Sequence, residues 1–301
     1  MTRTPQSAFD RTARFGVGLT LLAASGFAAV SILTTIAMRT GVSLSTVLTW
    51  RYVLSAAVLV VWVGITGQAR RMPARESVLW LGIGGGGQAL MIYLALSSLA
   101  YISAGTLAFL FYTYPVWVTL VQAVRGAEHL DARRAVALGL SFVGTLVMVG
   151  SPDMGGAALH GVMLALGAAV LYGLLIPAMQ HMQKDWPVVV TSAWSKIGAA
   201  ICFLIASAGN QTLQVAMTGT AWGAIVALTV WSTVLPSLFF LMGLMRLGPV
   251  RTAIVSTVEP FLTALLGVAV LGQALTLRTL AGGIAIVAAV IVLQFKRTRV
   301  A

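Results

Sequence analysis

Long apolar stretches, each closed by charged or turn residues, follow one another along almost the whole chain. A helix of about 20 such residues crosses about 30 Å of hydrocarbon at a rise of about 1.5 Å per residue. The pattern predicts an all-α integral membrane protein with ten transmembrane helices. The predicted spans cover residues 15–38, 43–65, 77–97, 102–124, 134–150, 160–180, 187–208, 220–243, 249–271 and 278–295.

The basic residues fall mainly in the loops on one side of these predicted spans. Cytoplasmic loops carry an excess of Lys and Arg, and the side alternates at each crossing. That side receives Arg3, Arg11, Arg14, Arg70, Arg71, Arg75, Arg125, Arg133, Arg134, Lys184, Arg246, Arg251, Lys296, Arg297 and Arg299. The other side receives Arg39 and Arg278. The distribution predicts a multi-pass protein of a bacterial inner (plasma) membrane with both termini in the cytoplasm.

The composition agrees with a membrane environment, because 59% of the residues are hydrophobic and 9% are charged. A water-soluble fold of this composition would lack polar side chains to cover its surface. Lys and Arg total 19 against 7 Asp and Glu, but the basic residues do not cluster beside aromatic ones, which argues against a nucleic-acid partner. We expect membrane lipid and a small-molecule substrate as partners. The short predicted loops indicate no obligate protein partner.

The chain superposes on itself at an offset of 145 positions. This offset pairs Gly16 with Gly161, Arg51 with Lys196, Pro115 with Pro260 and Arg133 with Arg278. We interpret it as a duplication, with residues 1–150 as the first five-helix repeat and residues 151–301 as the second. Since five is odd, the second repeat is predicted to be inverted, and inverted repeats place a substrate site near the bilayer midplane.

Two related stretches carry a resemblance to a known family. The first is 104–128 with Pro115 near its centre, followed by Gly-Ala-Glu-His-Leu at 126–130. The second has Glu259-Pro260 and then Gly-Gln-Ala-Leu at 272–275. Both resemble the EamA type of the drug/metabolite transporter superfamily, except that Gln273 stands where a Glu is usual.

The resemblance implies ten helices, export of small metabolites and no nucleotide hydrolysis. The aromatic run Phe-Leu-Phe-Tyr-Thr-Tyr-Pro-Val-Trp at 109–117 resembles the YddG-type amino acid exporters within that superfamily. This narrower resemblance implies amino acids, aromatic or neutral, as the exported solutes.

Three charged side chains fall inside predicted spans. Arg51 and Lys196 pair under the repeat, and a cation at that position can hold a substrate carboxylate or a neighbouring acidic group. The alternative is that each is a helix-end charge that reaches headgroups or backbone carbonyls. Glu259 lies near the midplane, where it is a candidate for proton coupling or amine recognition. Its alternative role is that of a protonated group donating to a carbonyl that Pro260 leaves free.

Uncharged side chains in the spans extend the predicted substrate site. Aromatic candidates for stacking or cation-π contact are Tyr93, Tyr112, Trp117, Tyr172, Trp194 and Trp231. Polar candidates for orienting a ligand are Gln88, Ser192, Ser232, Ser256 and Thr257. Both groups also have a purely structural alternative. Aromatic residues in spans also pack against other helices or lie at the membrane–water interface, and polar residues also form hydrogen bonds between helices.

Proline and glycine interrupt several spans. Proline removes a helix hydrogen bond, so Pro115, Pro177, Pro236 and Pro260 are predicted kinks that act as hinges or merely adapt the helix shape. The glycine run at 84–87 lies mid-span without a following Lys-Ser or Lys-Thr, which favours close helix approach over phosphate binding.

The sequence does not favour an enzyme. His129, His160 and His181 fall in predicted loops, and Glu259 has no second midplane carboxylate beside it. We expect no cofactor and no metal. The predicted function is a secondary transporter that exports small metabolites, amino acids first, by alternating access. Alternatives are another solute, such as a drug, nucleobase or polyamine, or else a channel or a scaffold.

Overall fold

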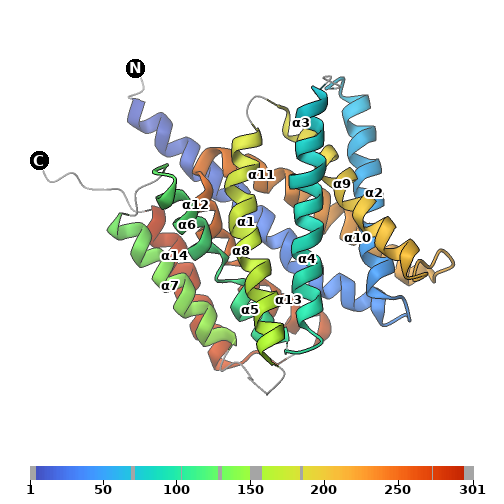
Figure 1. Ribbon diagram of the computed structural model, residues 1–301. Coiled ribbons are helices and arrows are strands. Elements are labelled where there is room, and N and C mark those ends of the chain that lie inside the picture. Colours follow the sequence, from blue (N-terminus) through green and yellow to red (C-terminus); the bar gives the residue numbers. More distant parts are fainter. Residues whose placement is uncertain are drawn as a thin grey trace, which may run out of the picture.

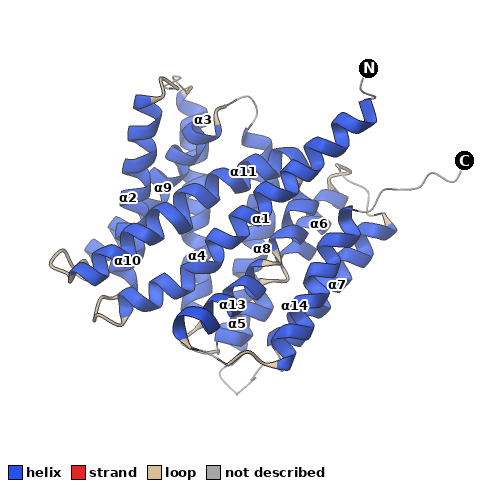
Figure 2. Cartoon of the chain, turned by 180° about the vertical axis from the view of Figure 1, so that it is seen from behind, coloured by secondary structure: helices blue, strands red, loops and turns tan. Residues whose placement is uncertain are grey.

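The computed structural model describes residues 5–68, 72–102, 104–127, 131–149, 158–183, 186–272 and 274–294. All regular structure in these ranges is helical (Figure 2). The elements in chain order are α1 (Pro5–Met38), α2 (Leu44–Ile65), α3 (Ala74–Leu79), η1 (Trp80–Gly86), α4 (Gly87–Ser98), α5 (Ala104–Phe111), α6 (Tyr114–Val124), α7 (Ala132–Val149), α8 (Ala158–Gln183), α9 (Val188–Gly209), α10 (Gly219–Thr229), η2 (Val230–Val234), α11 (Leu235–Leu247), α12 (Pro249–Ser256), α13 (Glu259–Leu271) and α14 (Leu277–Gln294). The segments η1 and η2 are π-helical.

The predicted all-helical membrane fold is confirmed. Within the described residues, eight helical stretches are long and apolar enough to cross a membrane. The two remaining predicted spans fall on α7 and α14, which have 18 residues each. Several of the loop residues used above for orientation, Arg70, Arg71 and Lys184 among them, lie outside the described residues, as do His129 and Gln273.

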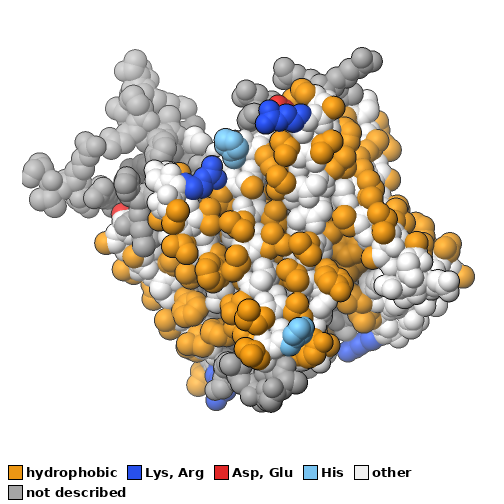
Figure 3. All heavy atoms as spheres, in the orientation of Figure 1, with side chains coloured by type: hydrophobic (Ala, Val, Ile, Leu, Met, Phe, Trp, Pro, Cys, Tyr) orange, Lys and Arg blue, Asp and Glu red, His pale blue; other side chains and the backbone are white. Residues whose placement is uncertain are grey.

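The face of the molecule seen in Figure 3 has a broad apolar band. In the face seen in Figure 3, the described Lys, Arg and His side chains lie near the upper and lower edges, and hydrophobic side chains fill the band between them. Large apolar side chains are exposed on the helices, for example Ile205 at 68% and Ile284 at 67%. Such a belt suits lipid contact, since lipid tails solvate apolar side chains that water does not.

The helices of the two halves interlock. The closest packing joins α7 to α14, α1 to α11, α2 to α9 and α4 to α8, and each of these pairs takes one helix from either half. Figure 1 shows the α7–α14 pair along one side of the bundle and α1 crossing behind α8. Because every main contact crosses between halves, the interior is shared by both.

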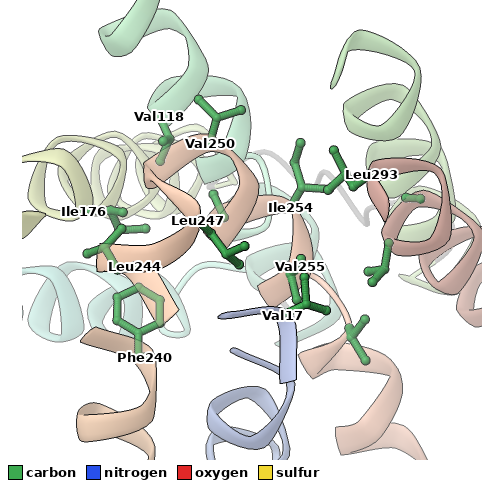
Figure 4. Close-up of a cluster of buried hydrophobic side chains, with 14 of the residues drawn as sticks. Val17, Val118, Ile176, Phe240, Leu244, Leu247, Val250, Ile254, Val255 and Leu293 are labelled. Carbon is green, nitrogen blue, oxygen red and sulfur yellow. The ribbon is translucent and has the colours of Figure 1, made fainter. Parts of the chain in front are cut away.

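The largest buried cluster ties α1 and α6 to α8, α11, α12 and α14. Its members include Val17, Val118, Ile176, Leu244 and Ile254, each at most 8% exposed (Figure 4). This cluster surrounds the places where two spans are interrupted, and so fixes the direction of the half-helices that follow.

Those interruptions coincide with prolines. One span breaks between α5 and α6, immediately before Pro115, and another between α12 and α13, immediately before Pro260. Thr113 and Thr257 cap the breaks by donating from their hydroxyls to the carbonyls of Leu110 and Ile254 at 2.6 Å. Broken spans with capped carbonyls are typical of transporter binding sites.

The other two prolines differ in setting. Pro177 lies inside α8, which continues past it to Gln183. Pro236 starts the α-helical turn after η2, and a Cβ at Gly26 of α1 would collide with its ring. Pro236 therefore lies at a close approach of α1 to α11.

The glycine run packs against α9. A Cβ on Gly85 would lie 2.6 Å from the Cα of Gly198, so two helix backbones touch there. The expectation of close helix approach is met at this position.

Candidate functional site

Two buried cations lie close to one tyrosine ring. Arg51 of α2 is 7% exposed and Lys196 of α9 is 3% exposed. The Arg51 Cζ lies 5.3 Å from the centroid of the Tyr52 ring, and the Lys196 Nζ lies 5.5 Å from it. Both distances suit cation-π attraction. Both side chains are buried in the bundle, and Arg51 donates to a backbone carbonyl, as the alternative interpretation of the sequence allows.

Each cation is held by a side chain of the opposite half. The Lys196 Nζ donates to the Gln88 Oε1 at 2.9 Å. The Arg51 Nε donates to the Thr233 Oγ1 at 2.6 Å, and its Nη2 donates to the Ser232 carbonyl at 3.3 Å. These bonds supply the partners that a buried charge requires.

Thr233 was not predicted from the sequence, although a signal for it existed. The offset of 145 that pairs Arg51 with Lys196 also pairs Gln88 with Thr233. Thr233 lies in η2, and its own hydroxyl donates to the Leu228 carbonyl at 2.8 Å, which leaves an oxygen lone pair for Arg51. Tyr52 was likewise missed.

A small hollow opens beside Lys196. Its volume is about 40 Å³. The lining consists of Phe27, Trp80, Gln88, Tyr172, Met179, Ser192, Ser195, Lys196, Ser237, Phe240 and Leu241. Four predicted site residues, Gln88, Tyr172, Ser192 and Lys196, meet here, whereas Arg51 lies outside the lining.

A larger cavity holds the acidic candidate. Its volume is about 460 Å³. It is lined by Phe27, Val30, Ser31, Ile32, Thr35, Ala108, Tyr112, Glu259, Pro260, Thr263, Ala264, Leu271 and Thr279. The half-buried Glu259 stands in the first turn of α13, where the positive end of the helix dipole favours an anion. It interacts electrostatically with Tyr112 and Arg51.

An aromatic cluster stands between the two cavities. Phe111 stacks on Tyr172 with 5.6 Å between ring centroids, and Tyr114 lies 4.8 Å from Tyr172. The Tyr114 hydroxyl donates to the Ala253 carbonyl at 3.2 Å, and the buried Ser256 lies beside Tyr114.

Three predicted aromatic residues lie elsewhere. Tyr93 and Trp231 are 64% and 63% exposed, so both side chains point away from the bundle interior. Trp194 is half-buried and lines neither cavity. The structure does not bring these three together with the charged side chains.

A third cavity, of about 180 Å³, lies at the end of the bundle where α3 begins. It is lined by Arg75, Glu76, Leu79, Trp80, His181 and Met182. The Trp186 indole donates a hydrogen bond to the Glu76 carboxylate beside it. Trp80, which is 1% exposed, lines both this cavity and the hollow at Lys196. The described residues contain no cluster of three or more metal-ligating His, Cys, Asp or Glu.

The geometry can be compared with known proteins. A model described as "EamA-like transporter family" matches residues 14–150 and again residues 159–295. A curated relative from Bacillus subtilis (strain 168), described as "Uncharacterized transporter YcbK", is 24% identical over 286 residues, which cover 91% of each chain. A solved structure titled "Crystal structure of protein" superposes with a TM-score of 0.79 at 17% identity, covering 92% of this chain and 96% of that one. That structural likeness shows the fold alone.

Proposed function

Because two successive segments match one family model, the chain belongs to the EamA-like transporter family, and we propose that it is a secondary transporter that exports small zwitterionic metabolites, amino acids first, by alternating access. A transporter of this family is a multi-pass membrane protein that binds a small-molecule substrate. The amino acid substrate and the alternating-access mechanism are the parts that we propose.

The observation that carries the proposal is the presence of opposite charges in one membrane interior. Lys196 and Arg51 supply buried cations, and Glu259 supplies a carboxylate on the wall of a large cavity. Charged groups within the hydrocarbon region are costly and are characteristic of substrate or ion pathways. A solute with a carboxylate, an amine and an apolar side chain complements this set and the aromatic cluster around Tyr172.

Two cross-half hydrogen bonds support an inverted repeat. Under the offset of 145 positions, Arg51 is equivalent to Lys196 and Gln88 is equivalent to Thr233. The hydrogen bond from Arg51 to Thr233 therefore corresponds to the one from Lys196 to Gln88. Equivalent residues therefore exchange partners between the halves, as a two-fold axis relating them would require. We propose ten spans, with residues 1–150 and 151–301 as the two inverted units.

The cavities support alternating access. Leu271 and Thr279, which line the large cavity, flank the turn between α13 and α14 and lie far from the end where α1 begins. Near that end, buried Trp80 separates the third cavity from the hollow at Lys196. With both termini in the cytoplasm of a bacterial cell, as the charge pattern predicts, the large cavity faces outward. The breaks before Pro115 and Pro260 are the proposed hinges.

A counterflow assay in proteoliposomes tests the proposal. We expect leucine or phenylalanine loaded inside to accelerate entry of the labelled amino acid, and Lys196→Met and Glu259→Gln to abolish this exchange without loss of folded protein. The matched controls Arg125→Gln and Tyr93→Phe alter exposed side chains and should exchange normally. Exchange that is unaffected in both site variants would refute the assigned roles.

The large cavity favours one other solute class. Its lining is mostly apolar with a single carboxylate, Glu259, which also suits an amphipathic amine such as a cationic drug. If labelled amines exchange and amino acids do not, this second candidate replaces the first. Flux without stimulation from the opposite side would instead indicate a channel.

A further inference from the structure

From the hollow beside Lys196 we infer a dedicated carboxylate-binding site, in which the Lys196 ammonium, the Ser192 hydroxyl and the Trp80 indole N–H all donate to the substrate carboxylate. The inference rests on the proposed function and assigns one end of the substrate to one set of residues. It also adds Trp80, which the repeat and the charge pattern did not reveal.

Two of the three donors are buried without a protein acceptor. Ser192 and Trp80 are each 1% exposed, and neither the Ser192 Oγ nor the Trp80 Nε1 has a hydrogen-bond partner. An unpaired buried polar group destabilises a fold, so its presence calls for an explanation such as a ligand or water. Lys196 has three N–H donors, and its hydrogen bond to Gln88 uses one of them. All three side chains line the same hollow, and each has an N–H or O–H without a protein acceptor.

Arg51 has a different role from Lys196. Its Nε and Nη2 donate to Thr233 and to the Ser232 carbonyl, and its side chain does not line the hollow. Arg51 therefore joins α2 to η2, while Lys196 faces the open space. The two repeat-related cations have diverged into a positioning residue and a ligand-binding residue.

The size of the hollow selects the group that enters it. About 40 Å³ exceeds the roughly 10–15 Å³ that a cavity needs to hold one water, so the hollow has room for a small group such as a carboxylate. Phe27 and Tyr172 also line the hollow, and Phe27 continues into the large cavity. The apolar part of the substrate extends in that direction.

The indole of Trp80 is held in place by the glycine run. A Cβ at Gly84 would lie 2.7 Å from the Trp80 Cε3, so the ring packs directly over that glycine. Trp80 is also the first residue of η1, and π-helical turns are frequent at functional sites. Gly84 therefore provides the space that lets the indole line the hollow.

The test compares a carboxylate with its amide. Counterflow of labelled leucine and of labelled leucinamide is measured for the wild type and for Ser192→Ala and Trp80→Phe, the latter keeping a ring while removing the N–H. Loss of one donor to a charged acceptor should raise the KM for leucine about tenfold and leave the KM for leucinamide unchanged. Tyr93→Phe is the control, because the Tyr93 side chain is 64% exposed and does not line the hollow.

A binding measurement separates the inference from the proposed function. Thermal stabilisation of the purified protein by 4-methylpentanoate, which keeps the carboxylate of leucine and lacks the amine, is recorded for the same variants. If no amino acid is transported but this anion stabilises the wild type and not Ser192→Ala, the transport proposal fails and the carboxylate site stands. If leucine is transported and the leucine-to-leucinamide ratio of KM values is the same in the wild type, Ser192→Ala and Trp80→Phe, the carboxylate site is refuted. Should Trp80→Phe not fold, Ser192→Ala alone decides.

Discussion

The Phe27 ring of α1 packs edge-to-face against the Phe240 ring of α11, with 6.3 Å between their centroids. Phe27 also lines both the large cavity and the hollow at Lys196. One side chain therefore forms part of the partition between the carboxylate of Glu259 and the ammonium of Lys196. This partition is the basis of the first prediction.

Phe27→Ala should connect the two cavities. We expect passive leak of substrate from proteoliposomes to rise and accumulation of label by counterflow to fall to near zero, because the side chain that separates the spaces is gone. Phe27→Leu, which keeps most of the volume, should retain accumulation. Normal accumulation by the alanine variant would show that another group forms the partition.

Lys196→Met and Arg51→Met should fail in different ways. The Lys196 variant is expected to lose transport with little change in melting temperature, since methionine fills a similar space and the losses are one hydrogen bond to Gln88 and the contact with the Tyr52 ring. The Arg51 variant should be the less stable, by about 3 kcal/mol, because two buried hydrogen bonds from a charged donor disappear. Thermal unfolding in detergent beside counterflow measures both. Equal destabilisation of the two variants would contradict the division of roles.

Gly85→Ala should prevent correct assembly. Its new methyl would overlap the backbone of α9 at Ser195 and Gly198, and backbone cannot move aside as a flexible side chain can. Gly82→Ala is the control in the same segment, because a Cβ there has no atom within 4 Å. We expect a monodisperse peak in size-exclusion chromatography for the Gly82 variant and aggregation for the Gly85 variant. Equal yields of folded protein would show that η1 and α9 can separate.

The hydrogen bond from Trp186 to Glu76 should hold the α3 end of the bundle closed. Trp186→Phe, which removes the N–H and keeps a ring, is expected to expose the Lys196 hollow more often to that side. A cysteine at Ser192 reports this opening through its rate of labelling by a membrane-impermeant thiol reagent. Cys202, the one cysteine in the sequence, is exposed and must first be replaced.

For the Trp186→Phe variant, faster labelling of Ser192→Cys is the expected outcome. Tyr93→Phe, far out on the lipid-facing surface, is the control and should leave the labelling rate unchanged. An unchanged rate in Trp186→Phe would mean that this bond does not restrain the opening.

The charged part of the site was predictable because charge is rare inside hydrocarbon. Lys196, Arg51 and Glu259 were recognisable as exceptions in apolar spans, and the structure buries the two cations and places Glu259 on a cavity wall. Their partners were harder to find. Thr233 resembles many other membrane threonines, and only its offset from Gln88 marks it.

The aromatic residues could not be assigned from the sequence. In a membrane both the lipid-facing and the interior-facing sides of a helix are apolar, so periodicity does not separate them. Tyr93 and Tyr172 read alike in the sequence, yet the first is 64% exposed and the second lines the hollow. Trp80 stands near the start of its span, where a tryptophan is usually taken as an interface marker.

Arg51 and Lys196 each form a hydrogen bond with the opposite half of the chain, which has a consequence for expressing the two halves as separate fragments. Each half alone would carry a cation into the lipid with its acceptor missing, since Thr233 and Gln88 belong to the other half. Two separately synthesised fragments would neutralise that penalty by assembling with each other. Fragments that are degraded when expressed singly should thus be stable when co-expressed. The cross-half hydrogen bonds would make the stability of each half depend on the presence of the other.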